Sequence, residues 1–572
     1  MNFRQVGSLT PGHPEYGHTV GVEATTGPLG AGMGMAVGMA MAEKHLASVF
    51  NKESYPVVDH FTYVLGGDGC MMEGISSEAF SLAGTLGLGK LIVLYDSNRI
   101  SIEGSTDIAF RENVEERMKA FGFQTITVED GTDIDAIGAA IEVAKADTEH
   151  PSFITIKTEI GFGCPAKQGK ASAHGEPLGV ENVEALRKNL NWPSEEPFFV
   201  PEEVYKNYSE IAEQKAEVEA AWNVMFAAYC EEYPKMEALW NQYHNAKAGE
   251  ALKDDAGFWA KQEKPEASRA ISGRLINYIK DVLPNLFGGS ADLAPSNKTN
   301  MKDAGDFSKE DRAGRNLHFG VRELAMAAIG NGIMLHGGLR AYVSTFFVFS
   351  DYCKPMARLS ALMGVPLTYV FTHDSIGVGE DGPTHEPIEQ MAALRAMPNF
   401  HVFRPCDATE TEAAWYSAVT SEHTPTALVL TRQNLEPMAG SSREALKGGY
   451  IIDDCEGTPE LILIASGSEV ALAVHAKETL AAEGQKVRVV SMPCMDLFEE
   501  QSEEYKESVL PREVRRRVAV EALGSFGWDK YTGLDGKIIA MESFGASAPA
   551  GLLFKKFGFT VEHVVEVAKS LK

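Results

Sequence analysis

The stretch that decides the fold is residues 62–104, which begins TYVLGGDGCMMEG and ends LIVLYDSNRISIEG. Two short runs within it, 62–65 and 91–95, are rich in branched and aromatic residues, a composition typical of buried parallel strands. The first run is followed by GGDG and the second by DSN, and both sequences favour a turn. The stretch therefore predicts two neighbouring strands of an open α/β sheet with a helix between them.

Polar side chains follow both predicted strands. Ligands of open α/β sheets bind beyond the carboxyl ends of the strands, so Asp68 and Asn98 are expected to face one crevice. A carboxylate and a carboxamide oxygen form half of a site for a hard cation. The glycines around Asp68 let backbone N–H groups approach an anion, at the positive end of the following helix. Together these features predict a metal-bridged phosphate ester or diphosphate.

Length and composition set the broad class. With 572 residues the chain is too long for one core, and three or four domains are expected. A formal charge of −28 argues against nucleic acid or an anionic membrane as partner, and no segment approaches a membrane span. Seven scattered cysteines without CxxC spacing, and an N-terminus unlike a signal peptide, predict a cytoplasmic protein with reduced thiols.

The first 262 residues continue the α/β pattern. Before the decisive stretch, His13 lies between two prolines, and the turn formed by Gly27, Pro28, Leu29 and Gly30 precedes an Ala/Met/Gly-rich helix. The small residues of that helix suit a packing helix at least as well as close approach to a ligand. Residues 107–159 predict helix, strand, helix and strand. The loop 161–179, which contains His174, is interpreted as either a functional lid or a solvated loop, and 181–262 as largely helical.

A second α/β domain begins near residue 265. Glu323 opens an apolar helix, where it suits the helix dipole, or, if buried, could have a raised pKa and donate a proton. Phe346, Phe349 and Tyr352 have the spacing of one helical face, which predicts either core packing or a platform for a flat heterocycle.

The segment THDSIGVGEDGPTHEP, which follows the strand LTYVF, gathers two histidines and several carboxylates. A zinc site is the less favoured interpretation, because the segment has no HExxH-like spacing and its glycines and prolines would break any helix. A polar substrate-binding loop is the better interpretation. Arg432 follows another strand and suits a phosphate. The strands after residue 450 have no such polar cluster, which predicts a structural or dimer-supporting third domain.

Taken together, the motifs resemble one family. GDGCMMEG…DSNRISIEG resembles the thiamine-diphosphate motif, and TPGHPE, GPLG, HGEPLG, GSADLAPSN, HFGVRE, THDSIGVGEDGPTH and TRQN, in that order, are similar to the transketolase family over essentially the whole chain. The resemblance implies three doubly wound α/β domains, at 1–262 (pyrophosphate-binding, with a helical linker), 263–437 (pyrimidine-binding) and 438–572 (C-terminal). It also implies a homodimer with sites at the subunit interface.

The resemblance implies a thiamine diphosphate site with Mg2+, Ca2+ or another divalent cation. The implied metal ligands are Asp68, Asn98 and the backbone carbonyl of Ile100. The implied cofactor-binding residues are Gly27, Pro28, Leu29, Gly69, Glu73, Asn98, His174, Asp292, Leu293, Glu323, Phe346, Phe349 and Tyr352. Glu323 is implied as the catalytic acid at the aminopyrimidine ring, and His13, His174 and His373 as catalytic histidines.

The implied reaction moves a two-carbon ketol unit from a ketose phosphate such as xylulose 5-phosphate to an aldose phosphate such as ribose 5-phosphate or erythrose 4-phosphate, in the pentose phosphate pathway. The protein supplies orientation, proton transfer and anion binding, because the cofactor carries the difficult chemistry. The implied substrate-binding residues are His174, Arg269, Ser296, His373, Asp381, His385 and Arg432.

One departure from the family pattern concerns the start. Members of the family carry, before the FRQ…TPGHPE segment, a stretch with an SGHPG-type motif and another histidine, whereas this sequence begins MNFRQ. The expectation is a truncated or misassigned start, or a naturally shortened protein. Two alternatives to an active transketolase follow: a dihydroxyacetone synthase-like enzyme that uses formaldehyde as acceptor, and a shortened inactive relative that acts as a binding protein.

Overall fold

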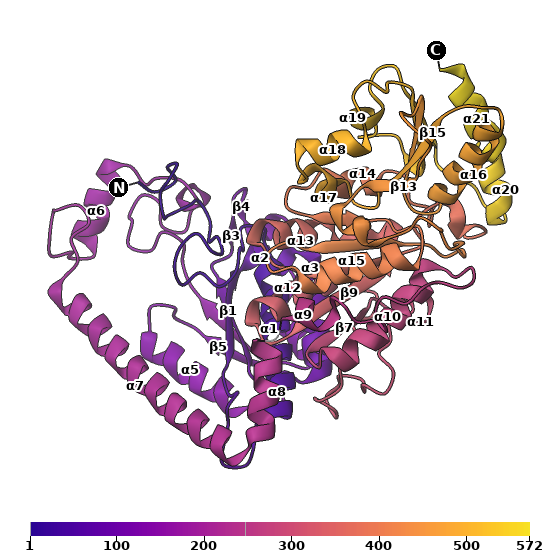
Figure 1. The fold of residues 1–572 in the computed structure, drawn as a ribbon. Coiled ribbons are helices and arrows are strands. Elements are labelled where there is room, and N and C mark those ends of the chain that lie inside the picture. The colour runs from indigo at the N-terminus through magenta and orange to yellow at the C-terminus, as the bar shows by residue number, and fades with distance from the viewer. Residues whose placement is uncertain (1, 246, 572) are drawn as a thin grey trace. The chain divides into compact units, whose positions relative to one another are not determined.

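The chain forms two compact units, shown in Figure 1. The computed structural model describes residues 2–245 and 247–571. The first unit comprises Met1–His244 with Ser308–Ala313, and the second comprises Asn245–Phe307 with Gly314–Lys572. Each unit is described by itself below.

The first unit is built on a four-stranded parallel sheet in the order β1-β2-β6-β5. Its strands are β1 (Thr62–Gly67), β2 (Leu91–Ser97), β5 (Gln124–Val128) and β6 (Ser152–Lys157), and a small antiparallel ribbon pairs β3 (Ile100–Ser101) with β4 (Gly104–Ser105). The two predicted strands are thus direct neighbours. Their pairing places Gly67 opposite Asp96, so both chains leave the sheet at the same edge.

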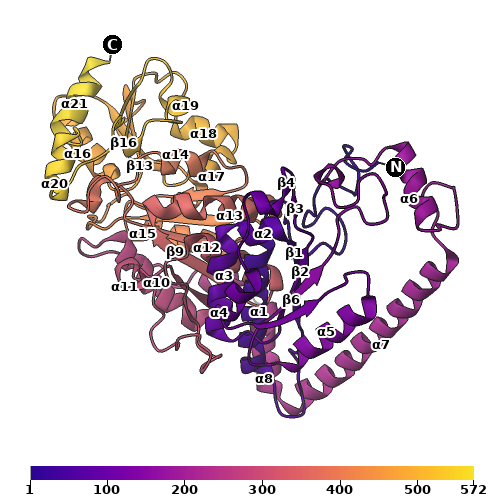
Figure 2. The ribbon, with the colours of Figure 1, turned by 180° about the vertical axis from the view of Figure 1, so that it is seen from behind.

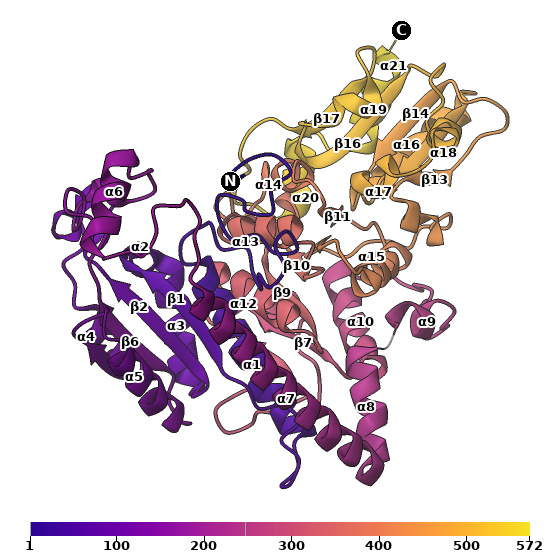
Figure 3. The same ribbon diagram turned by 90° about the vertical axis from the view of Figure 1, so that its left-hand side faces the viewer.

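Helices cover both faces of this sheet. Its helices are α1 (Ala31–Phe50), α2 (Asp68–Met72), α3 (Gly74–Leu86), the short 3-10 helix η1 (Thr106–Ile108), α4 (Val114–Ala120) and α5 (Ile134–Ala146). Helix α5 lies along β6 and β5 (Figure 3) and packs on the face that carries Ile92, Ile154 and Ile156. Helices α1 and α3 pack against each other, and α1 also contacts β1 and β2. The predicted order of helix, strand, helix and strand over 107–159 is confirmed.

The rest of the unit is largely helical, as predicted. The 3-10 helix η2 (Ala171–Ala173) and α6 (Val180–Asn189) precede the long helix α7 (Glu202–Glu232) and α8 (Pro234–His244), which Figure 2 shows from behind. An aromatic cluster fastens this pair: Trp222 stacks on Phe226 with ring centroids 4.8 Å apart, and Trp240 contacts Phe50 of α1 at 5.0 Å. The tryptophans of this segment therefore hold α7 and α8 on the domain.

The second unit contains two sheets. The first is six-stranded and parallel, in the order β11-β12-β10-β9-β7-β8. Its strands are β7 (Leu286–Ser290), β8 (Asn316–His318), β9 (Arg340–Phe346), β10 (Thr368–Thr372), β11 (His401–Phe403) and β12 (Thr426–Leu430). Its helices are α9 (Ala248–Leu252), α10 (Ser268–Val282), α11 (Ala294–Asn297), α12 (Glu323–His336), η3 (Phe347–Phe349), α13 (Ser350–Met363), η4 (Ile376–Val378), α14 (Gln390–Arg395) and α15 (Ala408–Thr420).

The second sheet of this unit has five strands in the order β13-β15-β14-β16-β17, of which only β13 is antiparallel. Its elements are η5 (Arg443–Lys447), β13 (Tyr450–Asp453), β14 (Leu461–Ala465), α16 (Glu469–Ala482), β15 (Val487–Ser491), α17 (Met495–Glu499), α18 (Glu503–Val509), β16 (Arg517–Gly524), α19 (Asp529–Thr532), β17 (Lys537–Met541), α20 (Ala550–Lys556) and α21 (Val561–Ser570). The three main sheets, each with helices on both faces, confirm the predicted α/β class.

One predicted element is wrong. Phe346, Phe349 and Tyr352 do not share a helical face: Phe346 ends β9, Phe349 ends η3, and Tyr352 lies in the first turn of α13. The apolar run as far as Phe346 belongs to a buried strand, because pairing with β10 extends to Phe346 and Thr372, and η3 begins at Phe347. Spacing alone could not locate the end of that strand.

Candidate active site

In the first unit, the turns that carry Asp68 and Asn98 leave the sheet at the same edge, after β1 and β2. Asp68 is the first residue of α2 and only 4% of it is exposed. Its Oδ2 atom accepts a hydrogen bond from the backbone N–H of Arg99 at 2.9 Å, and the Tyr95 hydroxyl donates to its Oδ1 atom at 2.5 Å. The turns after β1 and β2 are thereby joined through one carboxylate.

The residue types at this edge fit a divalent cation that is shared with a ligand. Asn98 lies beside Arg99, and its Oδ1 atom accepts from the Ile100 N–H at 3.0 Å, which fixes the turn that also holds the Ile100 carbonyl. Among the described residues no group of three or more His, Cys, Asp or Glu side chains could hold a metal ion. A cation here would have Asp68 as its one charged protein ligand, a donor set that suits Mg2+ with phosphate oxygens completing the shell.

The glycine-rich turn before α1 lies against the same edge. Gly30 has φ +77°, and a Cβ atom there would lie 2.5 Å from Cγ2 of Ile75 and 3.1 Å from Cβ of Glu73. A Cβ on Gly69 would lie 2.8 Å from Cδ1 of Leu29. The turn therefore packs on the segment that follows Asp68, and only glycine permits the approach.

The two predicted catalytic histidines of the first unit, His13 and His174, are exposed. The ring of His13 lies over Gly27, whose Cβ would be 3.3 Å from Cγ of His13, and His13 is exposed. His174 follows η2 in the long loop after β6 and is also exposed. Across residues 2–245, no hydrogen bond joins His174 to another predicted site residue.

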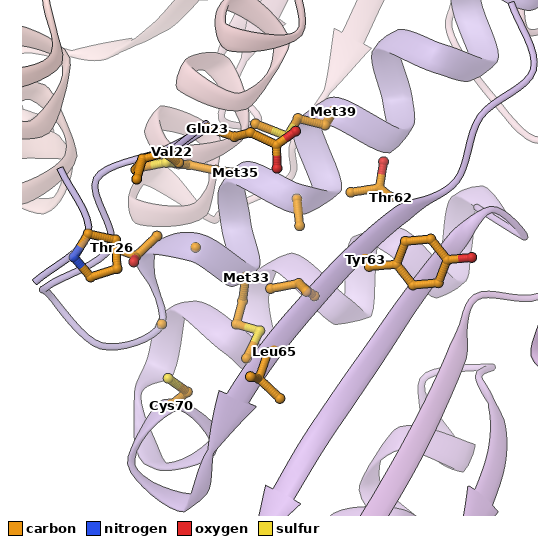
Figure 4. Close-up of a pocket in the computed structure, with 16 residues that line it drawn as sticks. Val22, Glu23, Thr26, Met33, Met35, Met39, Thr62, Tyr63, Leu65 and Cys70 are labelled. Carbon is orange, nitrogen blue, oxygen red and sulfur yellow. The ribbon is translucent and has the colours of Figure 1, made fainter. Parts of the chain in front are cut away.

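A cavity of about 360 Å³ lies beside this region, between α1, β1 and the loop before α1 (Figure 4). Met33, Met35 and Met39 of α1 line it, together with Leu65 and Cys70. Its lining is largely apolar, so it does not resemble the polar edge at Asp68. Cys70 fills space in this wall, and nothing in the described structure makes it a metal ligand.

In the second unit, Glu323 is the first residue of α12 and is half-buried. Phe346 and Phe349 lie with nearly parallel rings, at 10° and with centroids 6.1 Å apart, and Tyr352 lies 6.0 Å from Phe349. The three rings therefore adjoin although they come from a strand, a 3-10 helix and an α-helix. Asp292, with φ +61°, is exposed, and Leu293 before α11 is half-buried.

Cationic side chains gather near these rings. The Nη1 atom of Arg269 donates to the Ser296 carbonyl at 2.9 Å and to Nε2 of His373 at 3.3 Å. Burial lowers the pKa of Arg269, and the charge of Arg432 lowers it further, which places the two guanidinium groups within electrostatic reach. Two arginines this close suit a dianionic phosphate.

His373 is buried and neutral. Burial, followed by the charges of Arg269 and Arg432, lowers its pKa to about 3. Because Arg269 can only donate, Nε2 of His373 accepts and Nδ1 carries the proton, which it donates to Oγ1 of Thr372 at 2.8 Å. Thr372 in turn donates to Oδ1 of Asn297 at 2.7 Å. This relay fixes both the tautomer and the orientation of the ring.

The other predicted substrate residues differ in how they are held. His385 lies 5.5 Å from Phe349, ring to ring, and its Nδ1 atom lies 2.9 Å from Oγ1 of Thr384. Arg432 and Asp381 are exposed. The structure thus brings Arg269, Ser296, His373, Arg432 and His385 together with the aromatic rings, whereas no contact between Asp381 and that group is found among residues 247–571.

Sequence reasoning missed the groups that hold the site residues in place. Tyr95 supports Asp68, and Thr372 and Asn297 support His373. Asp374 lies in the polar loop but is fully buried against Arg404 at 2.9 Å, and Arg404 also pairs with Glu469 at 2.5 Å. Polar residues inside strands, such as Tyr95 and Thr372, were the available signal.

Comparisons with known proteins agree along the whole chain. Family models match residues 1–248 (transketolase, thiamine diphosphate binding domain), 264–438 (transketolase, pyrimidine binding domain) and 448–560 (transketolase-like C-terminal domain). The chain is 54% identical to a transketolase of Bacillus subtilis and 53% identical to one of Halalkalibacterium halodurans, covering 100% of this chain and 86% of each relative.

Solved structures give the same result. A transketolase from Leishmania mexicana superimposes with a TM-score of 0.95 at 46% identity, covering 100% of this chain and 85% of that one. Transketolases of Pichia stipitis match at 45% identity with TM-scores of 0.94 and 0.95, in complexes with sedoheptulose-7-phosphate and fructose-6-phosphate. Within the described residues no helix has the length and apolar character needed to span a membrane.

Proposed function

Because the chain belongs to the transketolase family, we propose that it transfers a two-carbon ketol group from xylulose 5-phosphate to ribose 5-phosphate or erythrose 4-phosphate. It is a thiamine-diphosphate-dependent transferase by family. The observation that carries the proposal is the group of Arg269, Arg432 and neutral His373 beside the aromatic rings, since it suits a phosphorylated sugar next to a flat cofactor.

Thiamine diphosphate, when bound, supplies the carbon nucleophile and the electron sink for the ketol unit. We assign the cation on its diphosphate, Mg2+ or Ca2+, to Asp68, Asn98 and the Ile100 carbonyl. We assign the diphosphate wall to the glycine-rich turn and the α2 segment. These residues are Gly27, Pro28, Leu29, Gly69 and Glu73, and His174 of the loop after β6 is assigned to the cofactor as well. The support is that Asp68 is buried and fixed in place before any ligand binds.

On the second unit, Glu323 is proposed to exchange a proton with the ring nitrogen of the aminopyrimidine. The aromatic rings of Phe346, Phe349 and Tyr352, with Asp292 and Leu293, are proposed to border that ring. The half-buried position of Glu323 at a helix start supports this, because its carboxyl can reach both ligand and solvent.

The substrate phosphate is assigned to Arg269, Ser296, His385 and Arg432, and a sugar hydroxyl to Asp381. His373 is proposed to contact the phosphate end of the substrate too, and because it is neutral it adds no charge there. His13 and His174 are proposed to handle protons at the reacting carbonyl. Both side chains are exposed and so accessible to a ligand.

We further propose that the chain forms a homodimer, and that the metal-bound cofactor sits in sites at the subunit interface. The support is apolar exposure beside the site: Tyr352 is 60% exposed and Val321, two residues before Glu323, is 75% exposed. We also propose domain limits at 1–262, 263–437 and 438–572, and a cytoplasmic location, which is supported by seven free cysteines.

The test is an assay of the chain with thiamine diphosphate, Mg2+, xylulose 5-phosphate and ribose 5-phosphate. Sedoheptulose 7-phosphate is the expected product, and Glu323→Gln is expected to lower kcat by about 10²–10⁴-fold while the cofactor still binds. Cofactor binding in calorimetry without any ketol transfer would contradict the proposal. Formaldehyde as sole acceptor is the control for the synthase-like alternative.

A further inference from the structure

Glu386 is an unusual residue in the second unit. It follows His385 directly, is 2% exposed, and neither of its carboxylate oxygens accepts a hydrogen bond of normal geometry in the described structure, although the Ala546 backbone N–H lies nearby. Burial raises its pKa to about 7, against a smaller opposing effect of the Ala546 backbone N–H. A buried carboxyl without partners costs free energy when it is ionised. The folded chain therefore favours the neutral form of Glu386, and such an unsatisfied group calls for an explanation.

The carboxyl occupies a gap that a glycine provides. Gly545 lies in the loop 542–549 between β17 and α20, and a Cβ atom there would lie 1.6 Å from Oε2 of Glu386. Gly545 does not have a positive φ, so its backbone would accept any residue. Space for the Glu386 carboxyl is therefore what requires glycine at this position.

The two loops meet at further points. A Cβ on Gly382 would lie 2.1 Å from Oγ of Ser547, and one on Gly379 would lie 3.4 Å from the Ala548 carbonyl. Ile376 and Ile388, near the two ends of the loop 373–389, belong to the core of the five-stranded sheet. The loop that carries both His373 and His385 thus rests on the C-terminal domain along its length.

We propose that Glu386 is a positioning residue, whose buried carboxyl locks the loop 373–389 into the gap at Gly545 and so presents His385 and His373 to the sugar phosphate. The proposal rests on the proposed function, because it takes those histidines as substrate-binding. It gives the third domain a part in substrate affinity.

Ionisation of Glu386 weakens this lock. No opposite charge compensates an ionised carboxylate there, so the loop exchanges more readily with open conformations as pH rises through the pKa. The charged and titratable groups on its own loop are His373, Asp374, Glu380, Asp381, His385 and Glu389, of which Asp374 is paired with Arg404. On the surrounding elements they are Glu542 of the opposing loop and Glu521 of β16, which is paired with Arg395 of α14 at 2.8 Å. None of them forms an ion pair with Glu386 in the described residues.

The decisive variants are Glu386→Gln, Glu386→Ala, Gly545→Ala and the double variant Glu386→Ala with Gly545→Ala, with Glu389→Gln as the control for loss of an exposed acid in the same loop. We expect Glu386→Ala to raise the KM for xylulose 5-phosphate about fivefold with little change in kcat. Glu386→Gln keeps the shape of the side chain but cannot ionise. Its KM is expected to equal that of the natural chain at about pH 6 and to stay unchanged at about pH 8, where the KM of the natural chain rises.

The double variant tests the gap directly. Gly545→Ala alone is expected to raise KM more than Glu386→Ala, and the double variant is expected to recover part of that loss because the new methyl group takes the vacated space. Three results would each overturn the proposal. They are additive effects of the two substitutions on KM, a KM of Glu386→Ala equal to that of the natural chain, and a pH profile of Glu386→Gln that follows the natural chain.

A readout without turnover separates this proposal from the proposed function. Hydrogen exchange of the peptide 374–390 is measured in the full chain and corrected for the intrinsic pH dependence of exchange. The corrected rate is expected to increase from about pH 6 to about pH 8 in the natural chain, and to increase less in Glu386→Gln. An unchanged KM in His385→Ala would refute the substrate role alone. An exchange rate that is the same in Glu386→Gln and the natural chain would refute the lock alone.

Discussion

His373 and His174 belong to one predicted set of substrate residues, yet the chain holds them in opposite ways. His373 is buried, accepts from Arg269 and donates to Thr372, which is itself held by Asn297. His174 lies exposed in a loop whose only regular element is the three-residue helix η2. The second unit thus holds its predicted groups through side-chain hydrogen bonds, while the predicted histidines of the first unit lie exposed in loops.

The difference follows from what lies beneath each loop. The loop 373–389 is anchored at both ends in a hydrophobic core and is backed by the buried ion pairs of Arg404. The segment around His174 in the loop after β6 is exposed, whereas Asp68 of the same unit is buried and held by two hydrogen bonds. Pre-organisation raises affinity by lowering the entropy lost on binding, so the two halves of the site are expected to respond differently to mutation.

The largest effect is expected from removing the support of the second unit. Arg404→Met leaves Asp374 and Glu469 buried without their partner and is expected to lower the free energy of unfolding by about 3–5 kcal/mol. Denaturant unfolding followed by circular dichroism measures it. The matched control is Arg443→Met, whose ion pair with Asp254 is exposed; an equal loss in both variants would refute the special role of the buried network.

The next effect concerns Asp68, the buried site candidate of the first unit. Asp68→Ala removes the proposed charged metal ligand and leaves the Tyr95 hydroxyl and the Arg99 N–H without their acceptor. Affinity for thiamine diphosphate in the presence of Mg2+ is expected to fall about 100-fold, measured by calorimetry. Asp107→Ala, which removes an exposed carboxylate 4.0 Å from Arg99, is the control and is expected to bind normally.

Acid sensitivity distinguishes the two histidines. The pKa of His373 is about 3 in the folded chain and about 6.5 when unfolded. Its contribution is therefore fully present above about pH 6.5 and is lost as pH falls, at about 1.4 kcal/mol for each pH unit. His373→Gln is expected to lose less stability than the natural chain between about pH 6.5 and pH 5. Equal losses in the two proteins would show that His373 protonates freely.

The smallest effect is expected at the base of the loop that carries His174. Lys157 pairs with Glu129 at 2.6 Å, but both side chains are mostly exposed. Lys157→Ala is expected to change the free energy of unfolding by less than about 1 kcal/mol and to leave ketol transfer unchanged. A large loss of activity would show that the loop of the first unit is braced after all.

Local sequence determined the strands, the turns and the residue types of the site. The alternation of apolar runs with glycine-rich turns predicted β1 and β2 and placed Asp68 and Asn98 at one edge, because parallel neighbouring strands end together. The amphipathic and apolar patterns likewise predicted α10 and α12. The order of the motifs identified the family, since each motif is contiguous in the chain.

Only the tertiary structure decided which of those residues are rigid. The partners of His373, at Arg269, Thr372 and Asn297, come from segments up to 104 residues away, and the gap for Glu386 is made by a glycine in another domain. The aromatic stripe failed as a prediction for the same reason: strand pairing across the sheet, not helical spacing, sets where Phe346 ends its strand. Burial and pKa depend on these long-range neighbours, which no window of sequence contains.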